Sequence, residues 1–158
     1  MIKYKPKKHE ALLWSIALPG FGQILNGQFL KGIVFIFLEF LVNVQSNFNL
    51  AIVYSFTGEI IKAIEVTDYQ WLMFYPCLYM FAMWDAYRDA EGEMNSLSYL
   101  PFVFGAYFLT VGLIFSAKIK IFDHLIGPVF LPMLFLVLGL CIGLLIKLLV
   151  AKVQVKDG

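Results

Sequence analysis

Residues 128–150, PVFLPMLFLVLGLCIGLLIKLLV, are the most apolar run of the chain and decide its class. The run contains one charged residue, Lys147, and as a helix rising about 1.5 Å per residue it can cross a hydrocarbon core of about 30 Å. Three further apolar runs occupy residues 29–46, 70–87 and 98–117. Backbone polar groups in hydrocarbon must pair within the protein, so we predict an all-α integral membrane protein with four transmembrane helices.

The composition of the whole chain supports the same class. Its 158 residues are 61% hydrophobic and 15% charged, whereas average soluble domains are about 45–50% apolar and about 25% charged. The formal net charge of +1 is too small for the basic face of a nucleic-acid binder. We therefore expect the lipid bilayer as a partner, together with another membrane protein or a second copy of this chain, and no nucleic acid.

The segment at residues 11–27 leaves the number of crossings open. Its apolar part, ALLWSIALPGFGQIL at residues 11–25, would make a helix of only about 22 Å, shorter than the bilayer core. The segment is either a short re-entrant or interfacial helix, which gives four crossings, or a short span, which gives five.

The positive charges favour four crossings. With the basic tail of residues 1–10 in the cytoplasm, four crossings place nine Lys and Arg residues inside and three outside, whereas five crossings give seven and five. Because cytoplasmic loops carry the excess of Lys and Arg, we predict a cell-membrane protein with both termini cytoplasmic, and we keep five transmembrane helices as the alternative. Residues 50–66 place Glu59, Lys62 and Glu65 on one helical face, so we expect an amphipathic interfacial helix there.

The stretch LPGFGQILNGQFLKG, residues 18–32, is unusually polar and glycine-rich for a chain this apolar. Proline frees a carbonyl group, glycines let backbones approach closely, and amide side chains can supply the missing hydrogen bonds. We predict a tight turn buried against protein, with a substrate or ion site as the alternative. The candidate residues are Pro19, Gly20, Gly22, Gln23, Asn26 and Gly27.

The same residues resemble a known pattern. PGFGQ, then NGQ, then KG is similar to the P-G-x-G-Q motif of small bacterial membrane proteins in the TM2-domain group, and WDAYRDA at residues 84–90 fits the same broader family. The resemblance covers about residues 11–46. It implies two membrane helices paired across a short turn, with residues 11–25 as a span. That group has no agreed biochemical activity, so the resemblance implies a fold and no reaction.

The first long run carries a polar stripe. At about 100° per residue, five polar or small side chains fall within about 60° of one another on an otherwise apolar helix. They are Gln28, Gly32, Glu39, Asn43 and Ser46. Glu39 lies near the middle of the run, where an isolated carboxylate is costly, so we expect it to be protonated, paired or hydrated. It is either a packing element between helices or a proton- or cation-handling group.

Two further patterns lie at helix ends and faces. Asp85, Arg88 and Asp89 are spaced for ion pairs at the end of the second predicted span, either as an interfacial cluster or as a docking site for a partner. Gly139 and Gly143 form a G-x-x-x-G motif that can bring helices together at a dimer face.

No catalytic or metal-binding constellation is present in the sequence. The only histidines are His9 and His124, and the only cysteines are Cys77 and Cys141, in apolar runs. We therefore expect no cofactor and no enzymatic activity. The leading hypothesis is a membrane protein that acts by helix–helix binding, as an accessory subunit of a membrane complex or a homo-oligomer. The alternative is a small proton- or ion-coupled transporter or channel that uses Glu39, and the weakest is a lipid-modifying enzyme.

Overall fold

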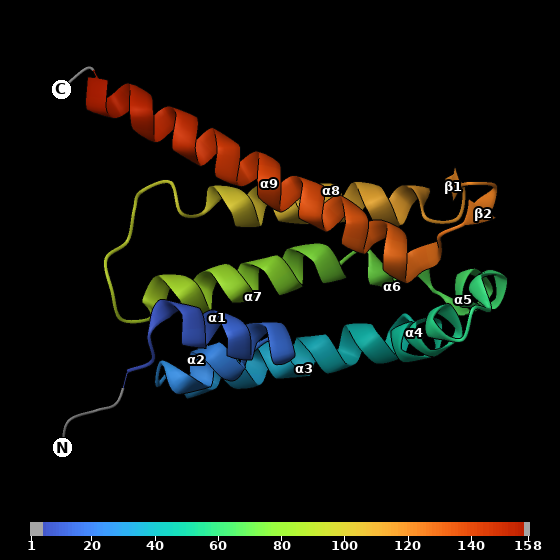
Figure 1. Ribbon diagram of the computed structural model, residues 1–158. Coiled ribbons are helices and arrows are strands. Elements are labelled where there is room, and N and C mark those ends of the chain that lie inside the picture. The colour runs from blue at the N-terminus through green and yellow to red at the C-terminus, as the bar shows by residue number, and fades with distance from the viewer. Residues whose placement is uncertain (1–4, 157–158) are drawn as a thin grey trace.

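Helices form most of the four apolar runs, so the computed structural model, which describes residues 5–156, belongs to the all-α class as predicted (Figure 1). Residues 1–4 of the basic tail lie outside the described residues. The elements in chain order are α1 (Lys8–Ala17), α2 (Phe21–Leu25), α3 (Phe29–Gln45), α4 (Phe48–Phe56), α5 (Ile60–Val66), α6 (Tyr69–Leu72), α7 (Tyr75–Asp89), α8 (Leu100–Phe115), β1 (Lys120–Ile121), β2 (His124–Leu125) and α9 (Gly127–Lys156).

The segment at residues 11–27 is a helical hairpin rather than one helix. The N–H of Phe21 donates to the carbonyl of Leu18 at 3.1 Å, and Gly20 has a φ of 109°, as in a type II turn with Pro19 at its second position. Helix α2 then ends at Leu25, and Gly27, with a φ of 79°, lets the N–H of Gln28 reach the carbonyl of Gln23. The chain therefore turns twice before α3 begins.

Two predicted helices are each divided in two. Instead of one helix over residues 50–66, α4 and α5 are separated at Gly58, whose φ of 83° closes a glycine cap. Instead of one helix over residues 70–87, α6 and α7 are separated at Met73 and Phe74. Pro76 has no N–H to donate to the carbonyl of Leu72, so the helix cannot run through this position unbroken.

The remaining predicted runs differ from the structure mainly at their ends. The run at 29–46 becomes α3, and α4 follows it after a bend of 65°. The run at 98–117 shortens to α8, and the run at 128–150 lengthens to α9. Within the described part of the chain, one helix is long and apolar enough to cross a membrane, Gly127–Val153 of α9, and α3 with α4 would count as a second if the bent pair is one span.

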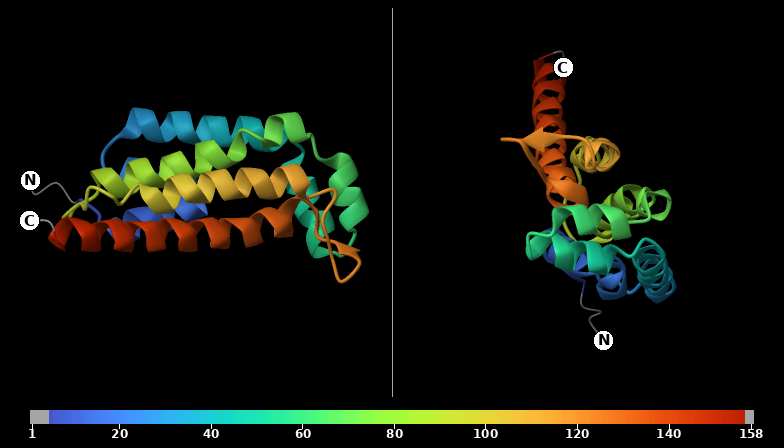
Figure 2. Two further views of the ribbon diagram at one scale, coloured as in Figure 1. Left: turned by 90° about the horizontal axis from the view of Figure 1, so that it is seen from above. Right: turned by 90° about the vertical axis from the view of Figure 1, so that its right-hand side faces the viewer.

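The long helices lie roughly along one axis, with α7 between the α1–α3 layer and the α8–α9 hairpin (Figures 1 and 2). The start of α1, the end of α9 and the loop between α7 and α8 lie at one end of the molecule, which we call the terminal end. Helices α4 to α6 and the β1–β2 hairpin lie at the opposite end. Gly139 and Gly143 bring α9 against α8, because a Cβ atom at these positions would lie 2.5 Å from the carbonyl oxygen of Phe104 and 2.6 Å from the Cα of Pro101.

Candidate functional site

The glycine-rich stretch and the end of α7 form one polar cluster. It contains Gln23, Asn26, Gln28 and Lys31 on one side and Asp85, Arg88 and Asp89 on the other. The sequence suggested two separate features, a turn and an ion-pair group. The structure brings them together although they are more than 50 residues apart in the chain.

The amide side chains of the cluster bind α7 rather than the turn. Gln23 is fully buried, and its Nε2 donates to the carbonyl of Ala82 at 2.7 Å and to Oδ2 of Asp85 at 3.2 Å. Asn26 donates to the carbonyl of Ala86 at 2.8 Å. We expected these amides to satisfy the carbonyl freed by Pro19, but their donors go to α7 instead, so they hold α2 against α7.

The charged groups of the cluster are layered by exposure. Lys31 Nζ lies 3.0 Å from Asp85 and 3.3 Å from Asp89, and Arg88 lies 2.8 Å from each of the same two carboxylates. The side chain of Asp85 is 4% exposed and that of Asp89 20%, whereas those of Lys31 and Arg88 are 46% and 38% exposed. The anions therefore face inward and the cations face outward.

Asp89 lies beyond the end of the predicted 70–87 span. The hydrogen bond from Arg88 holds the pKa of the Asp89 carboxyl well below its usual range, and hydrogen bonds from Gln28, at 2.6 Å, and from Lys31 act in the same direction. Gln28 thus belongs to this cluster and not to the stripe on α3, because it precedes the helix.

The other members of the stripe face the inside of the protein. Gly32 lies against the Pro19–Gly20 turn, since a Cβ on Gly32 would lie 2.8 Å from the carbonyl oxygen of Gly20. Ser46 is buried at the end of α3 and donates to the carbonyl of Asn43 at 3.3 Å. Pairs of small residues therefore set how closely the turn and α3 approach, and no part of the stripe is left for a partner helix except the half-exposed Asn43.

Glu39 lies at the centre of a second polar site. Its side chain is buried, and its Oε1 accepts a hydrogen bond from the hydroxyl of Tyr75 on α7 at 2.9 Å. Its Oε2 and the Oδ1 of Asn43 have no hydrogen-bond partner among the described residues. Tyr75 stacks on Tyr79, whose hydroxyl donates to the carbonyl of Ile16. This site therefore links α3, α7 and α1 through the hydrogen bonds of two tyrosine hydroxyls.

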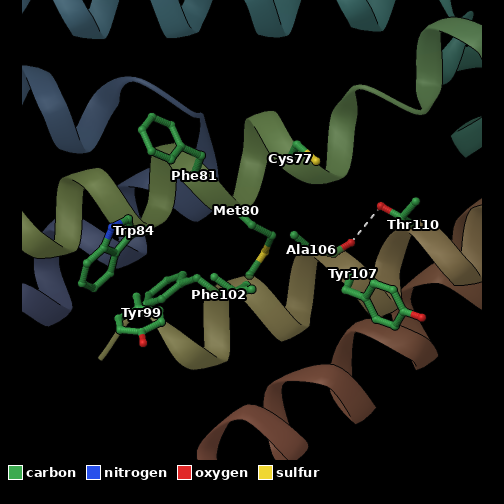
Figure 3. Close-up of a pocket in the computed structure, with 10 residues that line it drawn as sticks. Cys77, Met80, Phe81, Trp84, Tyr99, Phe102, Ala106, Tyr107 and Thr110 are labelled. Carbon is green, nitrogen blue, oxygen red and sulfur yellow. Dashed lines mark hydrogen bonds between the residues drawn. The ribbon is translucent and has the colours of Figure 1, made fainter. Parts of the chain in front are cut away.

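Two open grooves flank α7. The α7–α8 groove has a volume of about 730 Å³ and lies between Trp84, Tyr99 and Phe102 at one end and Cys77 and Thr110 at the other (Figure 3). The α3–α7 groove has a volume of about 470 Å³ and combines Lys31, Asp85 and Arg88 of the polar cluster with apolar side chains. The apolar members are Leu30, Val34, Phe35 and Phe81. Sequence reasoning did not find either groove, because both depend on how α7 packs against its neighbours.

Within residues 5–156 no group of three or more His, Cys, Asp or Glu side chains is placed to hold a metal ion. Comparison of the chain with protein-family models, with curated proteins and with solved structures gives no match. We therefore infer the function from the geometry of the polar cluster, the Glu39 site and the grooves.

Proposed function

We propose that this protein is a multi-pass integral membrane protein that acts by binding other membrane helices. The observation that carries the membrane assignment is the distribution of polarity. Phe37, Phe40 and Leu149 are each at least 60% exposed, whereas Gln23 and Glu39 are at most 7% exposed. Water-soluble monomers rarely expose large contiguous apolar surfaces. In a bilayer the outer surface cannot hydrogen-bond to the solvent, so polar side chains are placed inside the protein, where they find partners.

The contacts of the N-terminal segment support four crossings over five. The N–H of Glu91 donates to the carbonyl of Pro6 at 3.0 Å, and Lys8 Nζ lies 3.2 Å from the carbonyl of Tyr87. A chain with five crossings would put residues 5–8 and 88–96 on opposite sides of the bilayer. In the proposed topology α1 and α2 form a re-entrant hairpin, and α3, α6 with α7, α8 and α9 cross the membrane. The terminal end is cytoplasmic.

Cysteine labelling tests this topology. In a background with Cys77→Ser and Cys141→Ser, single cysteines are placed at Ser96, in the α7–α8 loop, and at Phe122, which is 94% exposed in the β1–β2 turn. An impermeant maleimide should label Phe122→Cys in intact cells and Ser96→Cys only after the membrane is opened. The reverse pattern, with Ser96→Cys labelled in intact cells and Phe122→Cys only after the membrane is opened, contradicts four crossings with a cytoplasmic terminal end and is what five crossings predict.

The free end of α9 supports a binding role. Helix α9 meets the start of α8 at Gly143 and then continues to Lys156, clear of the other helices (Figure 1). Leu145, Leu148 and Leu149 on this continuation are each 58% exposed or more. We propose that this part of α9 contacts a helix of a partner protein or of a second copy. The polar stripe of α3 is used within the chain, so it does not supply that contact.

Disulfide cross-linking tests for a second copy. Cys141 is exposed on α9, and Cys77→Ser leaves it as the only cysteine. Oxidation in native membranes should give a covalent dimer if α9 pairs with α9. The matched control, Cys141→Ser with Cys77 retained, should stay monomeric. Absence of a dimer together with co-purification of a stoichiometric membrane protein would support an accessory subunit. Absence of both contradicts the binding role.

A small ion-coupled transporter is the second candidate, and the Glu39 site favours it. A buried carboxylate oxygen without a partner, beside the equally unpartnered Oδ1 of Asn43, offers two acceptors that a proton or a cation can satisfy. Reconstituted in liposomes, the protein should then show pH-dependent flux that Glu39→Gln abolishes. Flux that is unchanged by this substitution excludes Glu39 as the coupling group.

A further inference from the structure

The outer face of α7 carries two grooves that share one wall. Phe81 is 55% exposed and lines both the α3–α7 groove and the α7–α8 groove. In Figure 3 its ring points away from α8, whereas Trp84, one turn along, lies on the side of Tyr99 and Phe102. Two apolar channels therefore run along α7 on either side of this side chain.

The α3–α7 groove ends at outward-facing positive charges. Lys31 and Arg88 line it at the terminal end, and the carboxylates that they pair with lie behind them. The hydrogen bonds described for Arg88 use Nε and Nη2, so both protons of Nη1 remain available. An anion that approaches from outside meets the free Nη1 donors of the guanidinium before it meets a carboxylate, which suits a charge-assisted hydrogen bond to a phosphate.

We propose that α7 binds one diacyl glycerophospholipid, with its phosphate on Arg88 and Lys31 and one acyl chain in each groove beside Phe81. This inference rests on the membrane assignment made above. The proposed topology places Arg88 at the cytoplasmic ends of α3 and α7, at the level of the headgroups.

The shape of the grooves favours acyl chains over a helix. Aromatic side chains bridge the helices on both sides of α7, with ring centroids 6.1 Å apart for Phe35 and Phe81 and 5.7 Å apart for Trp84 and Phe102. The grooves are therefore only as deep as one side chain, whereas a helix with its side chains is about 10 Å wide. A molecule with two thin apolar tails and one anionic head matches both the pair of grooves and the charge at their end.

Native mass spectrometry of the full-length protein in detergent tests the proposal, with palmitoyl-oleoyl phosphatidylglycerol as the added lipid. Arg88→Gln should weaken binding about tenfold, the loss expected for a charge-assisted hydrogen bond. Val34→Trp fills the α3–α7 groove without touching the ion pairs and should also weaken it. Lys62→Gln removes an exposed positive charge at the opposite end and should leave binding unchanged.

The remaining arms separate the alternatives. Lysophosphatidylglycerol, with one chain, should bind clearly more weakly than the diacyl lipid, and an excess of inorganic phosphate should not displace the lipid. Equal binding by wild type, Arg88→Gln and Val34→Trp overturns the proposal, as does equal binding of the lysolipid or displacement by phosphate alone. If the protein stays soluble and monomeric without any amphiphile, the membrane assignment itself fails. If the protein needs detergent but gives any of these contradicting results, only the proposed lipid site is refuted and the membrane assignment stands.

Discussion

Buried amide and carboxyl side chains join neighbouring helices of this protein. Gln23 shows why this works. Its Nε2 donates to a backbone carbonyl and a carboxylate of α7, and hydrogen bonds in surroundings of low dielectric are strong because water does not compete for the donors. The same reasoning applies to Glu39 and Tyr75, whose hydrogen bond joins α3 to α7.

The Glu39–Tyr75 pair gives the first prediction. Glu39→Gln keeps an acceptor for the Tyr75 hydroxyl and should change stability little, whereas Glu39→Leu leaves that hydroxyl buried and unpaired, at a cost of about 1–3 kcal/mol. The measurement is the free energy of unfolding in detergent micelles. In a Tyr75→Phe background Glu39→Leu should cost less. Equal costs in the two backgrounds would show that the two side chains are not coupled.

Asp89 gives a prediction for pH dependence. Its pKa is lowered in the folded state by Arg88, Gln28 and Lys31, so its stabilising contribution is fully present above its unfolded pKa of about 4. The contribution is lost as the pH falls below that value towards the folded pKa. Melting temperatures measured in detergent from pH 7 to strongly acidic pH should fall more steeply for wild type than for Asp89→Asn. Parallel curves would contradict the role of this carboxylate.

At the scale of elements, glycines fix how closely the N-terminal hairpin approaches α7. A Cβ on Gly22 would lie 2.2 Å from the Oγ of Ser15 and 2.6 Å from the Cβ of Ala86. Small residues allow such close approach of helix backbones, and in a membrane this packing replaces the hydrophobic driving force between helices.

Alanine substitution at two glycines separates packing from backbone strain. Gly22→Ala should destabilise the protein by about 1–3 kcal/mol, because α1, α2 and α7 must all move. Gly58→Ala meets no atom within 4 Å, so only its φ of 83° is strained, at about 1 kcal/mol. Thermal unfolding in one detergent compares them. A larger loss at Gly58 than at Gly22 would contradict the close packing of the hairpin.

The sequence predicts where helices form but not where they break or which of them meet. Hydropathy locates α3, α8 and α9 to within a few residues, except that α9 runs on to Lys156. It does not register the positive φ at Gly58 or the missing N–H of Pro76, because both matter only once the backbone has a particular geometry. Each break interrupts a run whose composition stays apolar on both sides, so the hydropathy of the sequence does not change where the helix ends.

The sequence predicted the two halves of the polar cluster but not the contact between them. The acceptors at positions 85 and 89 lie four residues apart on one helical face, which the sequence showed, whereas the donors at positions 23, 26 and 31 lie on either side of Gly27, in α2 and its C-cap and in α3, and share no face. Nothing in a single sequence says that these donors and acceptors meet, because their contact depends on the hairpin turning back at Gly20 and Gly27.

At the scale of the whole molecule, the G-x-x-x-G motif of α9 is occupied within the chain. A Cβ on Gly143 would lie 2.8 Å from the carbonyl oxygen of Leu100, so Gly143→Leu should push α8 and α9 apart and lower the melting temperature. It should not change the oligomeric mass measured by light scattering in detergent. Leu148 is exposed on the same helix. If α9 forms the interface between copies, Leu148→Ala should change the oligomeric mass and leave the melting temperature unchanged. A change of oligomeric mass in Gly143→Leu would show that this motif contacts a second copy of the chain.

In the proposed topology, the helices that cross the bilayer have unequal lengths, which has a consequence for the surrounding lipid. Helix α8 has 16 residues and is about 24 Å long, whereas the apolar part of α9 has 27 residues and is about 40 Å long. A hydrocarbon layer of about 30 Å must therefore thin beside α8, while α9 has to tilt strongly to keep its leucines covered. Each ångström of such mismatch has a modest energetic cost, so in that topology the protein would deform the bilayer unequally on its two sides.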